Sequence, residues 1–206
     1  YSGQLTTLVT VNPGASKAII FDPAYDTYAP AIVLNGGITH RIPTVYPDFR
    51  IDLERRRDTV NERPRLIMLN PPHNPSATTW SQHDINCLRE ITDGSRICLV
   101  SDEVYEHIVF DGQPHLSLLR YPDLASRTFA VFSFGKTYHA TGWRVGYCVA
   151  PAQFMQEFLR IHQYINFSTN APMQHALADF LRECPEYPLS LASFYEQKRD
   201  LFCHLL

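Results

Sequence analysis

The sequence predicts an α/β fold, a three-layer α-β-α sandwich around a mostly parallel (mixed) central sheet. Short, nearly continuous apolar segments alternate with amphipathic helical segments along the chain. This alternation is typical of strands that helices bury on both faces. The 206 residues are enough for one large domain and part of a second.

The elements follow one another in a regular order up to about residue 150. Residues 17–21 form a strand that Asp22-Pro23 ends, and residues 28–34 form a helix that ends at Gly36-Gly37. Residues 38–45 are extended. The remaining predicted elements are a helix at 51–62, a strand at 65–69, a helix at 81–92, and strands at 96–100, 128–132 and 145–150.

Two features mark where helices begin in this pattern. Ser81, followed by Asp84 three positions later, is close to a capping box and predicts the start of the helix at 81–92. After Pro151 the pattern becomes purely helical, with helices expected at about 152–165, 173–183 and 189–206. The change near residue 151 is the one candidate domain boundary.

Composition argues against several classes of protein. A net charge of −3 does not favour a surface that binds nucleic acid or an anionic membrane. The five cysteines are scattered without a CxxC pair, which is typical of reduced cysteines in a cytoplasmic protein. The nine histidines show neither HxH nor HExxH spacing, so no metal site is predicted. No apolar stretch approaches the roughly 20 residues of a membrane span.

Polar motifs follow three of the predicted strands at their carboxyl ends. Asn70 to Ser76 follows the strand at 65–69, Ser101 to Tyr105 follows the strand at 96–100, and Ser133 to Lys136 follows the strand at 128–132. Ligands of parallel sheets bind beyond the carboxyl ends of the strands. The three motifs therefore predict one site at one edge of the sheet.

Lys136 is the candidate nucleophile of this site. It follows a buried strand and a turn of small residues, Ser133 to Gly135, where water is scarce. A desolvated lysine amine is the group that forms Schiff bases. Asp102 also follows a buried strand, and it is either a helix N-cap or a carboxylate that pairs with a protonated ring nitrogen of a cofactor.

Four other residues have two readings each. Prolines stiffen the loop around Asn74, which either holds that side chain at one point or is a turn without a ligand. Arg144 lies among glycines and, with Ser133, suits a dianionic phosphate, although a structural salt bridge is the alternative. Tyr25 is either a ring-stacking residue or an aromatic residue of a surface turn.

Three motifs in order resemble the fold-type I pyridoxal-phosphate aminotransferases of class I/II. They are Asn-Pro-x-x-Asn-Pro from Asn70, Ser-Asp-Glu-Val-Tyr from Ser101, and Ser-Phe-x-Lys-Thr-x-x-x-Thr-Gly-Trp-Arg-x-Gly-Tyr from Ser133. Finer features resemble the bacterial methionine aminotransferase and kynurenine aminotransferase branch, among them residues 21–30, residues 73–78 and the segment Phe-Tyr-Glu-Gln-Lys-Arg-Asp at 194–200.

The resemblance implies a catalytic role for Lys136. In the family the matching lysine forms the internal aldimine with pyridoxal 5'-phosphate and then moves a proton between the substrate Cα and the cofactor C4′. The residue that matches Asp102 keeps the pyridine nitrogen protonated, so that the ring accepts the electrons of the carbanion.

The resemblance also implies how the rest of the cofactor is held. Tyr105 and Asn74 hydrogen-bond the phenolic oxygen, Ser133 and Arg144 hold the phosphate, and Tyr25 stacks on the ring. The implied substrates are an amino acid (methionine, aromatic or kynurenine-like) and a 2-oxo acid, and the implied assembly is a homodimer.

The resemblance covers only part of a family member. The sequence starts at Tyr1 without Met, so we expect an incomplete chain. Residues 1–165 would form the cofactor-binding large domain, incomplete at its N-terminal side. Residues 166–206 would form a helical segment that leads into a small C-terminal domain, largely absent here.

Two alternatives to the aminotransferase remain at this point. One is a pyridoxal-phosphate carbon–sulfur β-lyase on the same fold, which usually has His at the position of Tyr105. The other is a truncated chain that binds cofactor or a partner without turnover.

Overall fold

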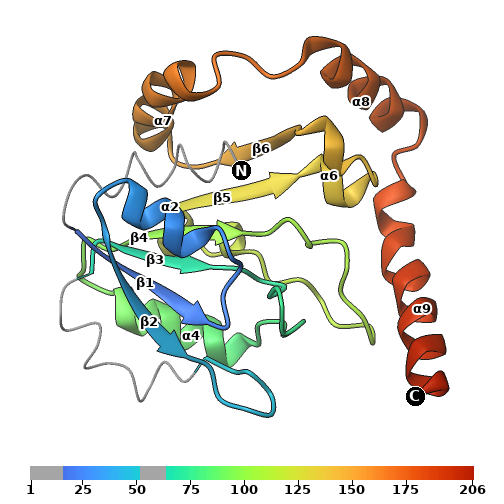
Figure 1. The fold of residues 1–206 in the computed structure, drawn as a ribbon, viewed down its shortest axis with the longest axis horizontal. Helices are drawn as coiled ribbons and strands as arrows, with labels where there is room; N and C mark the ends of the chain where they lie inside the picture. Colours follow the sequence, from blue (N-terminus) through green and yellow to red (C-terminus); the bar gives the residue numbers. More distant parts are fainter. Residues whose placement is uncertain (1–15, 52–63) are drawn as a thin grey trace.

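A single mixed sheet organises the protein (Figure 1). The structure is a computed structural model that describes residues 16–51 and 64–206. Within these residues the sheet has the order β2-β1-β3-β4-β5-β6, and only β6 is antiparallel to its neighbour. The strands are β1 (Lys17–Asp22), β2 (Ile38–Pro43), β3 (Leu66–Leu69), β4 (Cys98–Asp102), β5 (Thr128–Ser133) and β6 (Gly146–Val149).

Helices connect the strands and then extend beyond the sheet. Those before β6 are α2 (Tyr28–Leu34), α4 (Gln82–Thr92), η1 (Leu118–Arg120), α5 (Pro122–Ala125), α6 (Phe134–Thr137) and η2 (Thr141–Trp143). Those after β6 are α7 (Ala152–Ile165), α8 (Ala171–Glu183), η3 (Tyr187–Ser190) and α9 (Leu191–Leu205). Figure 1 shows α9 running alongside the edge of the sheet to which β3, β4 and β5 point.

The alternation of side chains along β1 divides the core into two halves. Ala18 and Ile20 point to one face, where α2 and α7 cover them, whereas Ile19 and Phe21 point to the other, beneath α4 and α5. The predicted three-layer α-β-α arrangement is therefore confirmed. On the first face, Phe129 of β5 is fully buried and stacks on Phe154 of α7 with ring centroids 5.1 Å apart.

Local signals in the sequence predicted several element boundaries correctly. The helix α2 begins and ends at the predicted residues, Tyr28 and Leu34. The capping box of α4 is present, because Ser81 Oγ accepts a hydrogen bond from the Asp84 amide while the Asp84 carboxylate accepts one from the Ser81 amide at 2.7 Å. The predicted helix at 51–62 lies, apart from Ile51, outside the described residues.

Two predicted boundaries were wrong near the polar motifs. The strand expected at 96–100 runs instead from Cys98 to Asp102, because Ser101 and Asp102 continue the pairing with Ala130 and Val131 of β5. No separate turn is present from Ser133 to Gly135, because Ser133 ends β5 and caps the short helix α6, which begins at Phe134 and includes Lys136.

The helices after β6 differ in how much they contribute to the core. Phe158 of α7, with the half-buried Phe154, packs on the sheet, whereas the one buried residue of α8, Leu177, and that of α9, Leu191, lie outside both core clusters. None of the helices within residues 16–51 and 64–206 has the length and apolar character that crossing a bilayer requires.

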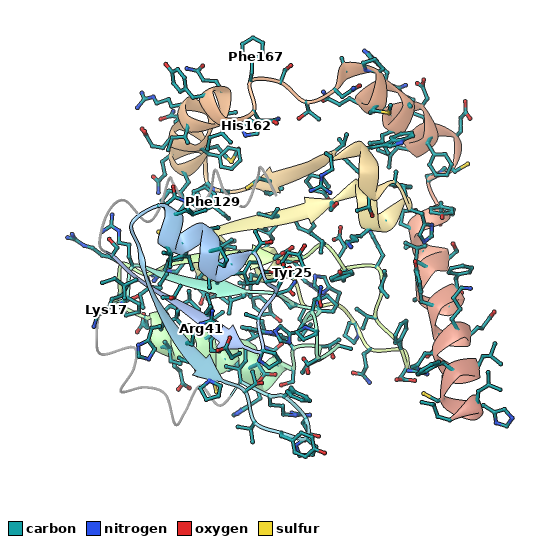
Figure 2. All side chains as sticks on the ribbon, in the orientation of Figure 1. Lys17, Tyr25, Arg41, Phe129, His162 and Phe167 are labelled. Atoms are coloured by element: carbon teal, nitrogen blue, oxygen red, sulfur yellow. The ribbon has the colours of Figure 1, made fainter. Side chains whose placement is uncertain are left out.

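We expect Phe129→Ala to lower the free energy of unfolding by about 3–5 kcal/mol, since it leaves a cavity between β5 and α7. Urea denaturation measures this change. The matched control is Phe167→Ala, because Phe167 is 86% exposed (both residues are labelled in Figure 2). We expect the control to stay within about 0.5 kcal/mol of the parent protein. Equal losses in both variants would contradict the core assignment.

Candidate active site

All seven residues predicted for the site line one cavity at the carboxyl-end edge of the sheet. The cavity has a volume of about 470 Å³, and Tyr25 marks its position in Figure 2. Its lining brings together the loop after β1, the motifs that follow β3, β4 and β5, and the turn before β6. The seven residues are Tyr25, Asn74, Asp102, Tyr105, Ser133, Lys136 and Arg144.

Asp102 is the buried carboxylate of this cavity. It is the last residue of β4 and is 3% exposed. The hydroxyl of Tyr28, from α2, donates a hydrogen bond of 2.6 Å to its Oδ2. The reading of Asp102 as a helix N-cap is wrong, since the next helical element of the chain begins only at Leu118.

Tyr28 is a site residue that the sequence analysis did not identify. Burial, and next the negative charge of Asp102, raise the pKa of Tyr28 well above its usual value. The phenol therefore stays protonated and remains a hydrogen-bond donor to the carboxylate. The sequence carries no local signal for this contact, because the two residues are 74 positions apart.

Glu103 is a second buried carboxylate, directly after Asp102, and is 0% exposed. Its Oε1 accepts hydrogen bonds from Ser101 Oγ at 2.9 Å and from the Leu118 amide at 3.3 Å. Its Oε2 lies 2.8 Å from Nε2 of His115. These contacts hold the segment after β4 against the face of the sheet that α4 and α5 cover.

A chain of amide hydrogen bonds links Asp102 to Asn74 and Tyr105. The side chain of Asn70, 6% exposed, donates to the Asp102 carbonyl at 2.7 Å, and its Oδ1 accepts from the Asn74 amide at 2.9 Å. The Asn74 side chain in turn donates to the Tyr105 hydroxyl at 3.4 Å. Asn70 was also missed as a site residue, although it opens one of the three motifs.

His73 lies in the same loop as Asn74 but is not among the residues that line the cavity. Its Nδ1 is 2.6 Å from Ser76 Oγ, and burial lowers its pKa. The imidazole is half-buried and holds the loop together, rather than facing solvent or the cavity.

Lys136 projects toward the cavity from α6 and is half-buried. Its Nζ lies 5.4 Å from the centroid of the Tyr105 ring, a distance at which the ring face stabilises positive charge. Ser133 begins this helix, and its Oγ accepts a hydrogen bond from the Gly135 amide at 3.1 Å. Gly135 allows close packing, because a Cβ there would lie 2.8 Å from Thr141 Cα.

Arg144 approaches the cavity from the turn between η2 and β6. Its backbone is left-handed, with φ of 57°, and its guanidinium donates to the Thr141 carbonyl at 3.0 Å. Gly146, two residues later, pairs with Ser133, and a Cβ at this position would lie 2.4 Å from the Phe132 carbonyl oxygen. The strands β5 and β6 therefore hold Ser133 and Arg144 on the same side of the cavity.

The lining fits pyridoxal phosphate group by group. A lysine amine matches the aldehyde, a buried carboxylate matches a protonated pyridine nitrogen, an amide and a phenol match the ring oxygen, and a hydroxyl with a guanidinium matches the phosphate. The volume of about 470 Å³ lies in the usual range of cofactor sites. By contrast, the described residues contain no cluster of three or more His, Cys, Asp or Glu side chains that could hold a metal ion.

Comparison with known proteins agrees with this fit. Residues 2–206 match the profile of the family "Aminotransferase class I and II". The methionine aminotransferase of Escherichia coli is 50% identical over an alignment that covers 100% of this chain and 57% of that protein. The kynurenine–oxoglutarate transaminase of Dictyostelium discoideum is 32% identical and is aligned with 95% of this chain and 49% of its own length.

A solved structure extends the likeness to three dimensions. The crystal structure of YbdL from Escherichia coli, described as having a methionine aminotransferase function, matches with a TM-score of 0.95 at 49% identity. The match covers 98% of this chain and 54% of that one, and the chain spans about half the length of the relatives it matches. The chain belongs to the class I and II aminotransferases, a family that depends on pyridoxal phosphate.

Proposed function

We propose that this chain forms the pyridoxal-phosphate site of an aminotransferase, which moves an amino group from an amino acid to a 2-oxo acid. The observation that carries the proposal is the convergence of Lys136, Asp102 and Arg144 on one cavity. When bound there, pyridoxal phosphate supplies an electron sink for the carbanion formed at the substrate Cα. The residues of the chain supply binding, orientation and proton transfer.

Lys136 is proposed as the catalytic residue. Its Nζ would hold the cofactor through the aldehyde carbon, with loss of water, until the substrate amine displaces it; the freed amine would then accept the proton that leaves the substrate Cα and donate it again. The Tyr105 ring beside Nζ stabilises the amine while it carries this proton. No other lysine of the sequence lines the cavity, since Lys17 begins β1 and Lys198 lies on α9.

Asp102 is proposed to keep the ring nitrogen of the cofactor protonated. A buried carboxylate beside a pyridinium stabilises its proton by charge and hydrogen bonding. The hydrogen bond from Tyr28 to Oδ2 fixes the orientation of the carboxylate. Tyr28 thereby acts on the cofactor through Asp102.

The remaining residues are proposed to bind and orient the ring. Asn74 and Tyr105, already linked by a hydrogen bond, lie together to donate to the ring oxygen. Ser133 and Arg144 bind the phosphate, and Tyr25, held edge-on against Tyr28 at 5.6 Å, covers a ring face.

We further propose a methionine, aromatic or kynurenine-like amino donor, a homodimeric assembly and a cytoplasmic location. The names of the relatives support the donor classes, and the five free cysteines support a reducing compartment. We also propose residues 1–165 as the cofactor-binding domain and residues 166–206 as the start of a second domain. The small share of α8 and α9 in the core supports this division.

Borohydride reduction of the protein loaded with pyridoxal phosphate should attach the cofactor permanently to the peptide that contains Lys136. The chain has three lysines, so peptide mass spectrometry identifies the site without ambiguity. We expect Lys136→Ala to abolish the label and Lys198→Ala, the control, to retain it. Labelling of the Lys136→Ala protein at wild-type yield would refute the assignment.

Replacing Asp102 by Asn should lower kcat/KM about a hundredfold or more, because an amide does not hold the proton on the ring nitrogen. Tyr28→Phe removes one hydrogen bond to a charged group and should cost only about tenfold. Steady-state kinetics of the two variants of the whole protein measure the difference. A Tyr28→Phe loss as large as that of Asp102→Asn would contradict the roles given to the two residues.

Products distinguish the aminotransferase from a β-lyase. We expect the whole protein to convert methionine and a 2-oxo acid into a new amino acid, with no turnover when the 2-oxo acid is omitted. Release of pyruvate and ammonia from cystathionine, without any need for a 2-oxo acid, would favour the lyase instead. Chromatography of both product mixtures settles the choice.

A further inference from the structure

One sequence motif has no role in the site described above. The segment at 194–200, Phe-Tyr-Glu-Gln-Lys-Arg-Asp, lies on α9, outside the residues that line the cavity. Tyr195 and Arg199 are four positions apart and Glu196 is three before Arg199, so the three side chains share one face of the helix. This face contacts two segments that carry cofactor-site residues.

The first contact reaches the residues that directly follow α6, the short helix that contains Lys136. His139, three residues after the lysine, lies between two phenols, with Nδ1 2.9 Å from Tyr187 Oη and Nε2 2.7 Å from Tyr195 Oη. The backbone of His139 is left-handed, with φ of 54°, a conformation that needs support from its surroundings. Next to it, Tyr138 stacks on Tyr187 with centroids 5.8 Å apart.

The second contact reaches the loop that contains Tyr105. Arg199 forms a bidentate ion pair with Asp111, at 2.7 and 2.9 Å, and its guanidinium lies over the ring of Phe110. The Asp111 amide donates to the Glu196 carboxylate at 2.7 Å. Asp111 is also left-handed, with φ of 59°, so α9 contacts this loop at a turn.

The loop from Glu103 to Leu118 is therefore fastened at two places. Buried hydrogen bonds of Glu103 hold it next to β4, and α9 holds its outer turn at Asp111. Figure 1 shows α9 beside this loop and beside α6. The helix α9 contacts both segments, which are also joined by β4 and β5 in the sheet and by Tyr147 of β6, whose hydroxyl donates to Glu106 at 3.4 Å and whose ring packs on Phe134.

We propose that Tyr195, Glu196 and Arg199 are positioning residues that set the segment of α6 and His139, which carries Lys136, against the Tyr105 loop. The inference rests on the proposed function of Lys136 and Tyr105. The distance it fixes is the one between Lys136 Nζ and the Tyr105 ring, 5.4 Å in the structure. Displacements of about 1 Å at such a site are enough to cost affinity and rate.

The ion pair between Arg199 and Asp111 is better suited to orienting the loop than to stabilising the fold. Asp111 is exposed, and exposed ion pairs contribute little to folding free energy. The two hydrogen bonds from the Arg199 guanidinium to Asp111 nevertheless fix both the distance and the angle between the loop and α9. A single point charge does not fix the angle. The Arg199 guanidinium also holds the pKa of Asp111 below its usual range, so the carboxylate stays ionised at more acidic pH than an ordinary aspartate.

The test compares two double variants of the whole protein. Tyr195→Phe/Arg199→Met removes the Tyr195 hydroxyl and the Arg199 guanidinium from α9. Tyr164→Phe/Arg182→Met makes the same changes on α7 and α8, at a tyrosine that is 85% exposed and an arginine that pairs with its helix neighbour Asp179. The readouts are the Kd of pyridoxal phosphate, the pH midpoint of its absorption band when bound, and the Tm of the cofactor-free protein.

We expect the α9 variant to raise the Kd about tenfold and to shift the pH midpoint, as groups that orient binding residues do. Its cofactor-free Tm should stay within about 2 °C of the control variant. A wild-type Kd and midpoint in the α9 variant would overturn the proposal, and so would a rise in Kd that comes with a larger fall in Tm. Failure of the parent protein to bind pyridoxal phosphate would instead refute the proposed function.

Discussion

Parallel pairing of β3, β4 and β5 is the constraint on which the site depends. Because the three strands run in one direction, the polar residues that end each of them meet at one edge of the sheet. The apolar residues before them are buried on both faces of the sheet. Hydrophobic burial therefore makes the sheet rigid. The polar site residues lie just beyond the last buried apolar residues of the three strands.

Two consecutive carboxylates at that edge, Asp102 and Glu103, are buried and perform different tasks. Burying charge is unfavourable unless hydrogen bonds compensate it. Tyr28 donates to Asp102, on the cavity side, while Ser101, the Leu118 amide and His115 surround Glu103 on the other side. One carboxylate is thus oriented toward the place proposed for the cofactor ring, and its neighbour anchors the loop that holds Tyr105.

Much of this arrangement follows from local patterns in the sequence. Apolar alternation predicted the layers, the spacing of Ser81 and Asp84 predicted a capping box, and the order of the motifs predicted which side chains share the cavity. The contacts of Tyr28 and Asn70 with Asp102 were not predictable in this way, because they join residues 74 and 32 positions apart. The short helix of Lys136 was also missed, since its four residues carry no periodicity.

The length of those connections also determines when the site can form. The bond from Tyr28 to Asp102 closes a loop of 74 residues, and the ion pair of Asp111 with Arg199 closes one of 88. Contacts of such high sequence separation form late in folding, because the entropy of loop closure must be overcome first. Affinity for the cofactor should therefore emerge only with the complete fold, so cofactor uptake would separate native molecules from collapsed intermediates that already contain the sheet.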